Sequence, residues 1–341
     1  MNKNKRYEEL DCLRGLAALA VVLFHFTYGY DFGLKIMSED KFYFRYGNLG
    51  VQLFFLISGF VIFMTLDKTK KAKDFLVSRF SRLYPAYWAS IIITVTITTL
   101  LEVPFQEGIF SVKQVIVNFT MFQYWFKIKD VDGAYWTLAI ELIFYIIMLL
   151  IFLFKKLNYI IWICLIWLVL SVCFAAFEIP LGNYIKAILI LRFAPLFVGG
   201  IAFYLLKNKP MDIFLHILIL LSLCTEYYLL YQLDSDCIVY WIIFFFYVLF
   251  YLFIYDKLGF ISNKFLVFLG SISYSLYLIH ENIGIGIIYW LKKIADIQLF
   301  YLPITIILVI FLASFITFYI ERPALKWIRK YYVNFSDNNI K

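Results

Sequence analysis

Residues 10–25 read LDCLRGLAALAVVLFH and begin the first of a series of long apolar segments. A helix that crosses a bilayer needs about 20 predominantly apolar residues. Arg14 and His25 interrupt this run, and titratable side chains are costly in lipid, so each is a functional candidate by default. On an α-helix they fall on nearly the same face, about 16 Å apart along the axis. The stretch therefore predicts a membrane helix with two candidate functional residues on one face.

The composition of the whole chain supports a membrane setting. Of the 341 residues, 64% are hydrophobic and 16% are charged, whereas soluble domains have about 45–50% and about 25%. The lipid bilayer is therefore the expected solvent and partner. The net charge of +8 reports the orientation of membrane loops rather than nucleic-acid binding. The five cysteines are scattered, with no zinc or redox spacing, so no metal is expected.

The hydrophobic segments predict an all-α, polytopic membrane protein with about ten transmembrane helices and a single domain over residues 1–341. The connections are short except for residues 104–135. The expected segments are 12–31, 48–66, 83–103, 136–154, 158–177, 186–206, 213–231, 238–254, 266–291 and 302–320.

The Lys and Arg residues are distributed unevenly between alternate loops. Twenty of the 31 fall on the side that holds both termini, and nine fall on the opposite side. Positive charge is enriched in cytoplasmic loops. The distribution therefore predicts that both termini are cytoplasmic, in a multi-pass protein of the inner or plasma membrane.

Further titratable residues lie within the predicted segments. His216 has nothing distinctive beside it and is left aside, whereas Glu141, Arg192 and His280 are candidates. By depth, His25 and these three fall in the outer half of the membrane, and Arg14 lies near Arg79 and Arg82 at the cytoplasmic face. Simpler roles remain open, because Arg14 can snorkel to the interface, His25 can be a packed histidine, and Glu141 can pair with Arg192.

Six motifs in a fixed order resemble the acyltransferase-3 family of bacterial membrane-bound acyltransferases, which includes O-acetyltransferases of surface polysaccharides. The first three are an Arg, ten residues, His pattern at Arg14 and His25, FFLISGF with Ser58 and Gly59, and SRFSRLYP with Arg79, Arg82 and Pro85.

The later motifs extend the resemblance to about residue 330. They are WTLAIE with Trp136 and Glu141, GSISYSLYLIH with Tyr277 and His280, and ERP at 321–323. Thr137 replaces the family's usual Ser, and Asn282 stands where the family often has Pro. The chain ends soon after the tenth segment, so no extracytoplasmic hydrolase-like domain is expected.

The resemblance implies an acyltransferase with cytoplasmic acyl-CoA, acetyl-CoA above all, as donor and an extracytoplasmic or lipid-linked carbohydrate as acceptor. It also implies that activity depends on Arg14 and His25. Our hypothesis makes His25 the general base, since burial keeps an imidazole neutral, although an acyl-histidine intermediate remains open. Glu141 orients His25 or binds sugar hydroxyls.

The remaining candidates are assigned by chemistry and position. Guanidinium groups suit phosphates, so Arg79, Arg82 and Arg14 are expected to hold the nucleotide phosphates of the donor. Ser58, Trp136, Arg192, Tyr277 and His280 are expected to line the acceptor site. The rival hypothesis is an exporter of polysaccharide or lipid-linked sugar, which ten helices and buried charges also fit. The sequence shows no inverted repeat, and an exporter gives the Arg14–His25 pair no clear use.

Overall fold

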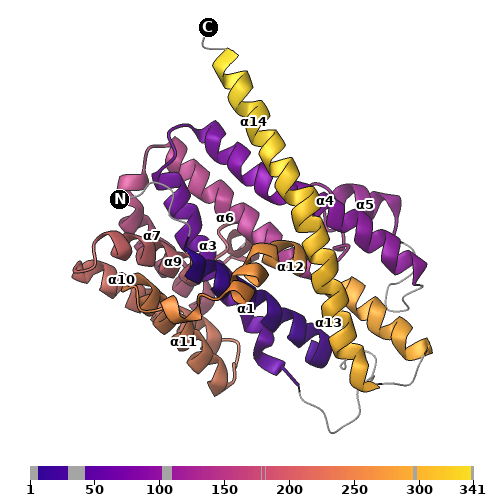
Figure 1. Cartoon of the computed structure of the whole chain (residues 1–341). Helices are drawn as coiled ribbons and strands as arrows, with labels where there is room; N and C mark the ends of the chain where they lie inside the picture. The colour runs from indigo at the N-terminus through magenta and orange to yellow at the C-terminus, as the bar shows by residue number, and fades with distance from the viewer. Residues whose placement is uncertain are drawn as a thin grey trace. The chain divides into compact units, whose positions relative to one another are not determined.

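The computed structural model describes residues 7–29, 43–101, 110–177, 179–180, 182–294 and 298–338 (Figure 1). Within these ranges all regular structure is helical, as predicted. Eight helices of the described residues are long and apolar enough to cross a membrane. The ends of the first and third predicted segments, at residues 31 and 103, lie outside the described residues.

The chain divides into two compact units, and α1, α4, α6 and α12 each contribute residues to both. Unit 1 comprises residues 1–17, 49–75 and 140–267, and unit 2 comprises residues 18–48, 76–139 and 268–341. The helices of unit 1 are α1 (Glu8–Phe24, through Ala17), α3 (Gly50–Asp67), α6 (Trp136–Leu153, from Ile140), η4 (Leu157–Tyr159), α7 (Ile160–Ala176), α8 (Gly182–Ile188), α9 (Ala194–Asn208), α10 (Ile213–Tyr231), α11 (Cys237–Ile254) and η5 (Gly259–Ile261).

Unit 2 contains the rest of α1 and two π-helical segments. Its elements are η1 (His25–Gly29), η2 (Arg45–Leu49, through Asn48), α4 (Ala72–Leu100, from Leu76), α5 (Val112–Asn118), η3 (Gly133–Tyr135), the start of α6 (through Ala139), α12 (Lys264–Ile294, from Phe268), α13 (Gln298–Phe315), η6 (Ile316–Glu321) and α14 (Arg322–Asn338). The last three form one uninterrupted rod, the yellow helix in Figure 1. The α12 helix is 31 residues long but carries Ser, His, Glu and Asn side chains in its middle, and it is not among the eight apolar helices.

The centre of unit 1 is α9, which packs against α3, α7, α10 and α11. Two glycines, Gly59 of α3 and Gly200 of α9, allow the close contact between α3 and α9. A Cβ atom at Gly200 would overlap the Leu56 carbonyl oxygen, and one at Gly59 would overlap the Phe197 carbonyl oxygen. Small residues let membrane helices approach closely, and these glycines bring the backbones of α3 and α9 into direct contact.

The predicted segment 186–206 is wrong as a single helix, because α8 ends at Ile188 and α9 begins at Ala194. Ile190 in the break has a φ of 45°, which is strained for a β-branched residue. The Trp167 indole donates to the Leu189 carbonyl at 2.7 Å and satisfies that acceptor at the break. Pro195 explains the restart, since proline favours the first turn of a helix. Arg192 therefore lies in the break.

The predicted start of the third segment, residue 83, is also wrong, because α4 begins at Ala72. Its first turns are rich in Lys and Arg, so hydropathy alone misses them. Arg79 and Arg82 consequently lie on a rigid helix, three residues apart and on neighbouring positions of one face.

Three aromatic side chains of α4 hold the last residue of α5 and the two residues after it. The Tyr87 hydroxyl, the Trp88 indole and the Tyr84 hydroxyl donate to the carbonyls of Asn118, Phe119 and Thr120 at 2.8, 2.9 and 3.1 Å. Three consecutive backbone acceptors are thereby satisfied from one helix. This attachment fixes the connection that leads to η3 and α6 within unit 2.

Candidate active site

The predicted site residues are distributed between the two units. Unit 1 holds Arg14, Ser58, Glu141 and Arg192, and unit 2 holds the six others, which are His25, Arg79, Arg82, Trp136, Tyr277 and His280. Each unit is described by itself, and a joint site remains a prediction.

In unit 1, Ser58 and Glu141 are brought together as direct partners. The Ser58 hydroxyl donates to Glu141 Oε1 at 2.5 Å, and the Tyr145 hydroxyl donates to the same oxygen at 2.6 Å. Ser58 and Tyr145 are 7% and 6% exposed. Two hydroxyl donors on one carboxylate oxygen hold Glu141 in a fixed orientation.

The pairing of Arg192 with Glu141, which the sequence left open, is not what the structure shows. Arg192 Nη1 instead lies 3.2 Å from Glu226 Oε1 of α10. Glu226 is completely buried, and an ionised carboxylate at such a place requires a partner. Arg192 therefore neutralises Glu226 from the break between α8 and α9. His216, left aside above, lies 3.1 Å from the Tyr251 hydroxyl and stacks on that ring.

In unit 2, His25 is the first residue of the π-helical segment η1, and such segments are frequent at functional sites. His25 Nδ1 lies 3.7 Å from Glu281 Oε1, and the centroid of its ring lies 5.0 Å from that of His280. His280 Nδ1 is 2.8 Å from the Tyr277 carbonyl, which only accepts, so Nδ1 carries the proton. His280 Nε2 is buried without a hydrogen-bond partner in the described structure. The cluster His25–Glu281–His280 therefore presents acceptor groups inside the unit.

Tyr277 and Trp136 lie near the start of α6. The Thr137 hydroxyl donates to the Tyr277 hydroxyl at 2.9 Å and joins α6 to α12. Tyr277 is 7% exposed and Trp136 is 42% exposed. The family resemblance places Thr137 where a Ser is usual. The bond to Tyr277 is made by the hydroxyl group, which Ser and Thr have in common.

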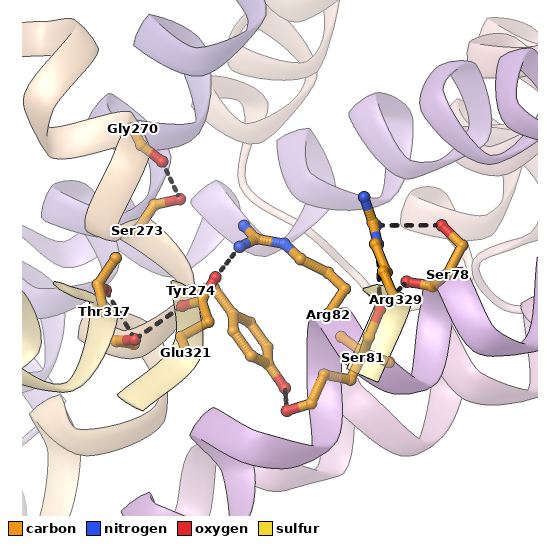
Figure 2. Close-up of polar contacts among 11 residues, drawn as sticks. Ser78, Ser81, Arg82, Gly270, Ser273, Tyr274, Thr317, Glu321 and Arg329 are labelled. Carbon is orange, nitrogen blue, oxygen red and sulfur yellow. Dashed lines mark hydrogen bonds and ion pairs between the residues drawn. The ribbon is translucent and has the colours of Figure 1, made fainter. Parts of the chain in front are cut away.

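Figure 2 shows the environment of Arg82, whose guanidinium forms an ion pair with Glu321 at the end of η6. Glu321 is 1% exposed, and its other oxygen accepts from the Ser275 hydroxyl at 3.1 Å. Ser275 in turn accepts from Thr317 at 2.8 Å. Arg82 also lies over the Tyr274 ring, 5.6 Å from its centroid. The ERP motif thus supplies the counter-charge of the second arginine of α4.

Arg79 is accompanied by Arg329 of α14, which sequence reasoning missed. Arg79 Nη2 lies 3.1 Å from the Ser78 hydroxyl. Arg329 Nη2 lies 3.4 Å from the same hydroxyl, and Arg329 Nε lies 3.3 Å from the Ser81 hydroxyl (Figure 2). The guanidinium groups of Arg79 and Arg329 meet at the Ser78 hydroxyl and give this site a strong positive charge. Such a place suits an anion with several oxygens.

Two carboxyl groups precede η3, the fully buried Asp132 and the half-buried Asp130. Asp132 accepts from the backbone amides of Ala134 and Asn282 at 3.1 and 3.0 Å. Burial raises the pKa of Asp132 to about 7, the charge of Asp130 adds to the rise, and the two amides oppose it. Burial also raises the pKa of Asp130, and a hydrogen bond from Gln123 opposes that shift.

Local patterns offered little signal for the missed residues. Glu226 and Glu281 lie within predicted membrane segments. The criterion that made Glu141 a candidate, the cost of a charged group in lipid, therefore applies to them as well. Their partners, however, lie far away in the sequence. Arg329 lies in the basic C-terminal stretch, outside every motif and every predicted segment, so the sequence does not single it out. The described residues include no group of three or more His, Cys, Asp and Glu side chains placed to hold a metal.

The chain matches the family model Acyl_transf_3, described as an acyltransferase domain, over residues 7–320. It therefore belongs to this acyltransferase family. No solved structure matches it.

Three relatives show what the chain is similar to. A protein of Staphylococcus aureus (strain COL) named "Putative O-acetyltransferase" is 31% identical over an alignment of 173 residues that covers 43% of this chain and 26% of that protein. A "Putative acetyltransferase" of Acidianus two-tailed virus is 27% identical over 79% of this chain and 80% of its own length. Nodulation protein 10 of Rhizobium leguminosarum bv. viciae is 26% identical over 40% of this chain and 41% of its own length. The match spans about a quarter of the length of the staphylococcal relative.

Proposed function

We propose that this membrane acyltransferase is an O-acyltransferase of the cell membrane, with both termini cytoplasmic. Its donor is cytoplasmic acyl-CoA, acetyl-CoA above all, and its acceptor is a hydroxyl of an extracytoplasmic or lipid-linked carbohydrate. The observation that carries this proposal is the cluster around His25 within a chain of an acyltransferase family. The O-acetyltransferase names of the relatives support the choice of an oxygen acceptor.

The reaction needs a base, a place for the oxyanion, and two positioned reactants. In this proposal His25 takes the proton of the acceptor hydroxyl, and the oxygen attacks the thioester carbon. The carbon–sulfur bond then breaks, and the departing thiolate of CoA takes the proton from His25. Bonds and protons balance without a metal or redox cofactor, and His280 Nε2 accepts from the acceptor sugar.

The donor phosphates are assigned to the arginines of unit 2. Arg79 and Arg329 share the Ser78 hydroxyl, whereas the charge of Arg82 is balanced by Glu321. We therefore make Arg79 and Arg329 the main phosphate ligands and Arg82 a support, with Arg14 as a further ligand from unit 1. Arg79→Ala should raise KM for acyl-CoA about tenfold or more. An unchanged KM would assign the arginines to topology alone.

The deciding experiment follows radiolabel from acetyl-CoA into envelope material, with wild type and His25→Ala at matched expression. Label in a glycan of the wild type that His25→Ala lacks supports the proposal, and the labelled product identifies the acceptor. Equal labelling by both proteins would show that His25 is not the base. Absence of labelling with every short acyl-CoA would favour the sugar exporter.

A further inference from the structure

Glu281 of α12 carries the carboxylate next to His25 in unit 2. Its Oε1 lies 3.7 Å from His25 Nδ1, and the two side chains are 19% and 22% exposed. Its Oε2 is buried without a hydrogen-bond partner in the described structure. A separation of 3.7 Å exceeds a direct hydrogen bond, but catalytic hydrogen bonds are often long before substrates bind and tighten afterwards.

The surroundings hold the Glu281 carboxylate in this place. A Cβ atom at Gly133 would overlap both carboxylate oxygens, so the side chain packs directly on the backbone of η3. The residue after Glu281 binds the two residues just before η3. The Asn282 amide nitrogen donates to Asp132 Oδ2 at 3.0 Å, and the Asn282 side chain donates to the Val131 carbonyl at 2.8 Å.

The sequence offered a different carboxylate, Glu141, either to orient His25 or to bind sugar hydroxyls. One oxygen of Glu141 already accepts from two hydroxyls of its own unit, those of Ser58 and Tyr145. Glu281 differs because its Oε1 faces the candidate base itself, 3.7 Å from His25 Nδ1.

We propose that Glu281 is the positioning residue of His25, a role that rests on the proposed acyl transfer. Glu281 Oε1 accepts from His25 Nδ1–H, which fixes the tautomer and leaves the lone pair of Nε2 for the acceptor hydroxyl. When Nε2 takes the proton, the carboxylate stabilises the imidazolium until the thiolate of CoA removes that proton. Glu281 itself neither gains nor loses a proton in this cycle.

The test uses the purified full-length protein with acetyl-CoA and the acceptor that the labelling experiment identifies. Glu281→Gln keeps the shape but offers His25 an amide. We expect kcat to fall about 100-fold or more, as wrong-tautomer variants of histidine bases do, with KM for acetyl-CoA within about twofold. Glu281→Asp withdraws the carboxylate by about 1.5 Å and should give an intermediate kcat. Asp67→Asn, at a carboxylate that accepts from Tyr204 in unit 1, is the matched control and should leave kcat unchanged.

Chemical rescue separates positioning from a purely structural role. Glu281→Ala leaves a gap next to His25 that formate can fill, so added formate should restore part of kcat. His25→Ala should remain inactive in formate. Failure of formate to restore Glu281→Ala would overturn the proposal, even if Glu281→Gln had lost activity through misfolding. So would a Glu281→Gln enzyme with kcat within twofold of wild type while His25→Ala is inactive, although the acyl transfer itself would then stand. A wild type without acyl transfer would overturn both.

Discussion

Asp132 is a single buried carboxyl that makes the stability of the protein depend on pH. It is fully buried, and its pKa in the folded state is about 7, against about 3.9 in an unfolded chain. Between about pH 4 and pH 7, Asp132 therefore keeps its proton in the folded state and loses it in the unfolded state. Stability through this group is highest below about pH 4 and falls as pH rises to about 7.

We expect Asp132→Asn to reduce this dependence. The unfolding temperature in detergent, measured at pH 5 and pH 8, should fall less with pH in the variant than in wild type. Asparagine has one acceptor for the two amides of Ala134 and Asn282, so the variant should also be less stable at pH 5. The slope, and not the absolute temperature, is the readout. An equal slope in both proteins would show that Asp132 is ionised at pH 5.

At the residue scale, the sequence singles out His25 and Ser58 as candidates because their motifs are local. It missed Glu281 and Glu321, since the importance of each depends on a partner that only the fold brings near. The same limit applies to Arg192, whose partner Glu226 lies on another helix. The free-energy cost of a charged side chain in lipid identifies these residues as candidates, but it does not show which residues pair with each other.

The ion pair between Arg82 of α4 and Glu321 of η6 joins two elements of unit 2. Arg82→Ala would leave Glu321, 1% exposed, as an uncompensated buried charge, and breaking a buried pair costs up to about 3–5 kcal/mol. Arg82 is one third exposed, so we expect a loss nearer to about 2 kcal/mol. Arg82→Ala combined with Glu321→Gln should recover most of it. Thermal unfolding checks this, and equal stability of the single and double variants would contradict it.

Helix contact in unit 1 provides a second test at this scale. Gly200→Ala should force α9 away from the Leu56 carbonyl and destabilise the protein by about 1–3 kcal/mol. Gly259→Ala is the matched control, because nothing lies within 4 Å of a Cβ atom there. Circular dichroism on heating compares the two variants. Equal unfolding temperatures would refute the close contact.

Most helices follow from hydropathy, whereas the exceptions have physical causes. The α8–α9 break depends on Pro195 and on a carbonyl satisfied by Trp167. The early start of α4 lies in a basic stretch whose helix is not apolar. The break leaves the average hydropathy of residues 186–206 unchanged, and the early start of α4 lies outside residues 83–103. Hydropathy alone therefore detects neither feature.

For the whole molecule, the distribution of Lys and Arg predicts its orientation. Lys70 should face the cytoplasm and Lys113 the outside, and both are exposed. In a parent with Cys224 and Cys237 replaced by Ser, since both are exposed, a membrane-impermeant maleimide should label Lys113→Cys in intact spheroplasts. It should label Lys70→Cys only after lysis. The reverse pattern would invert the topology and move the arginines of α4 to the outer side.

Gly133 also has an evolutionary consequence. Any side chain there would occupy the volume of the Glu281 carboxylate. In lineages where position 133 gains a side chain, position 281 should lose its long acidic one, and the reverse should hold. The two positions, far apart in the sequence, are therefore expected to change together among descendants of a common ancestor.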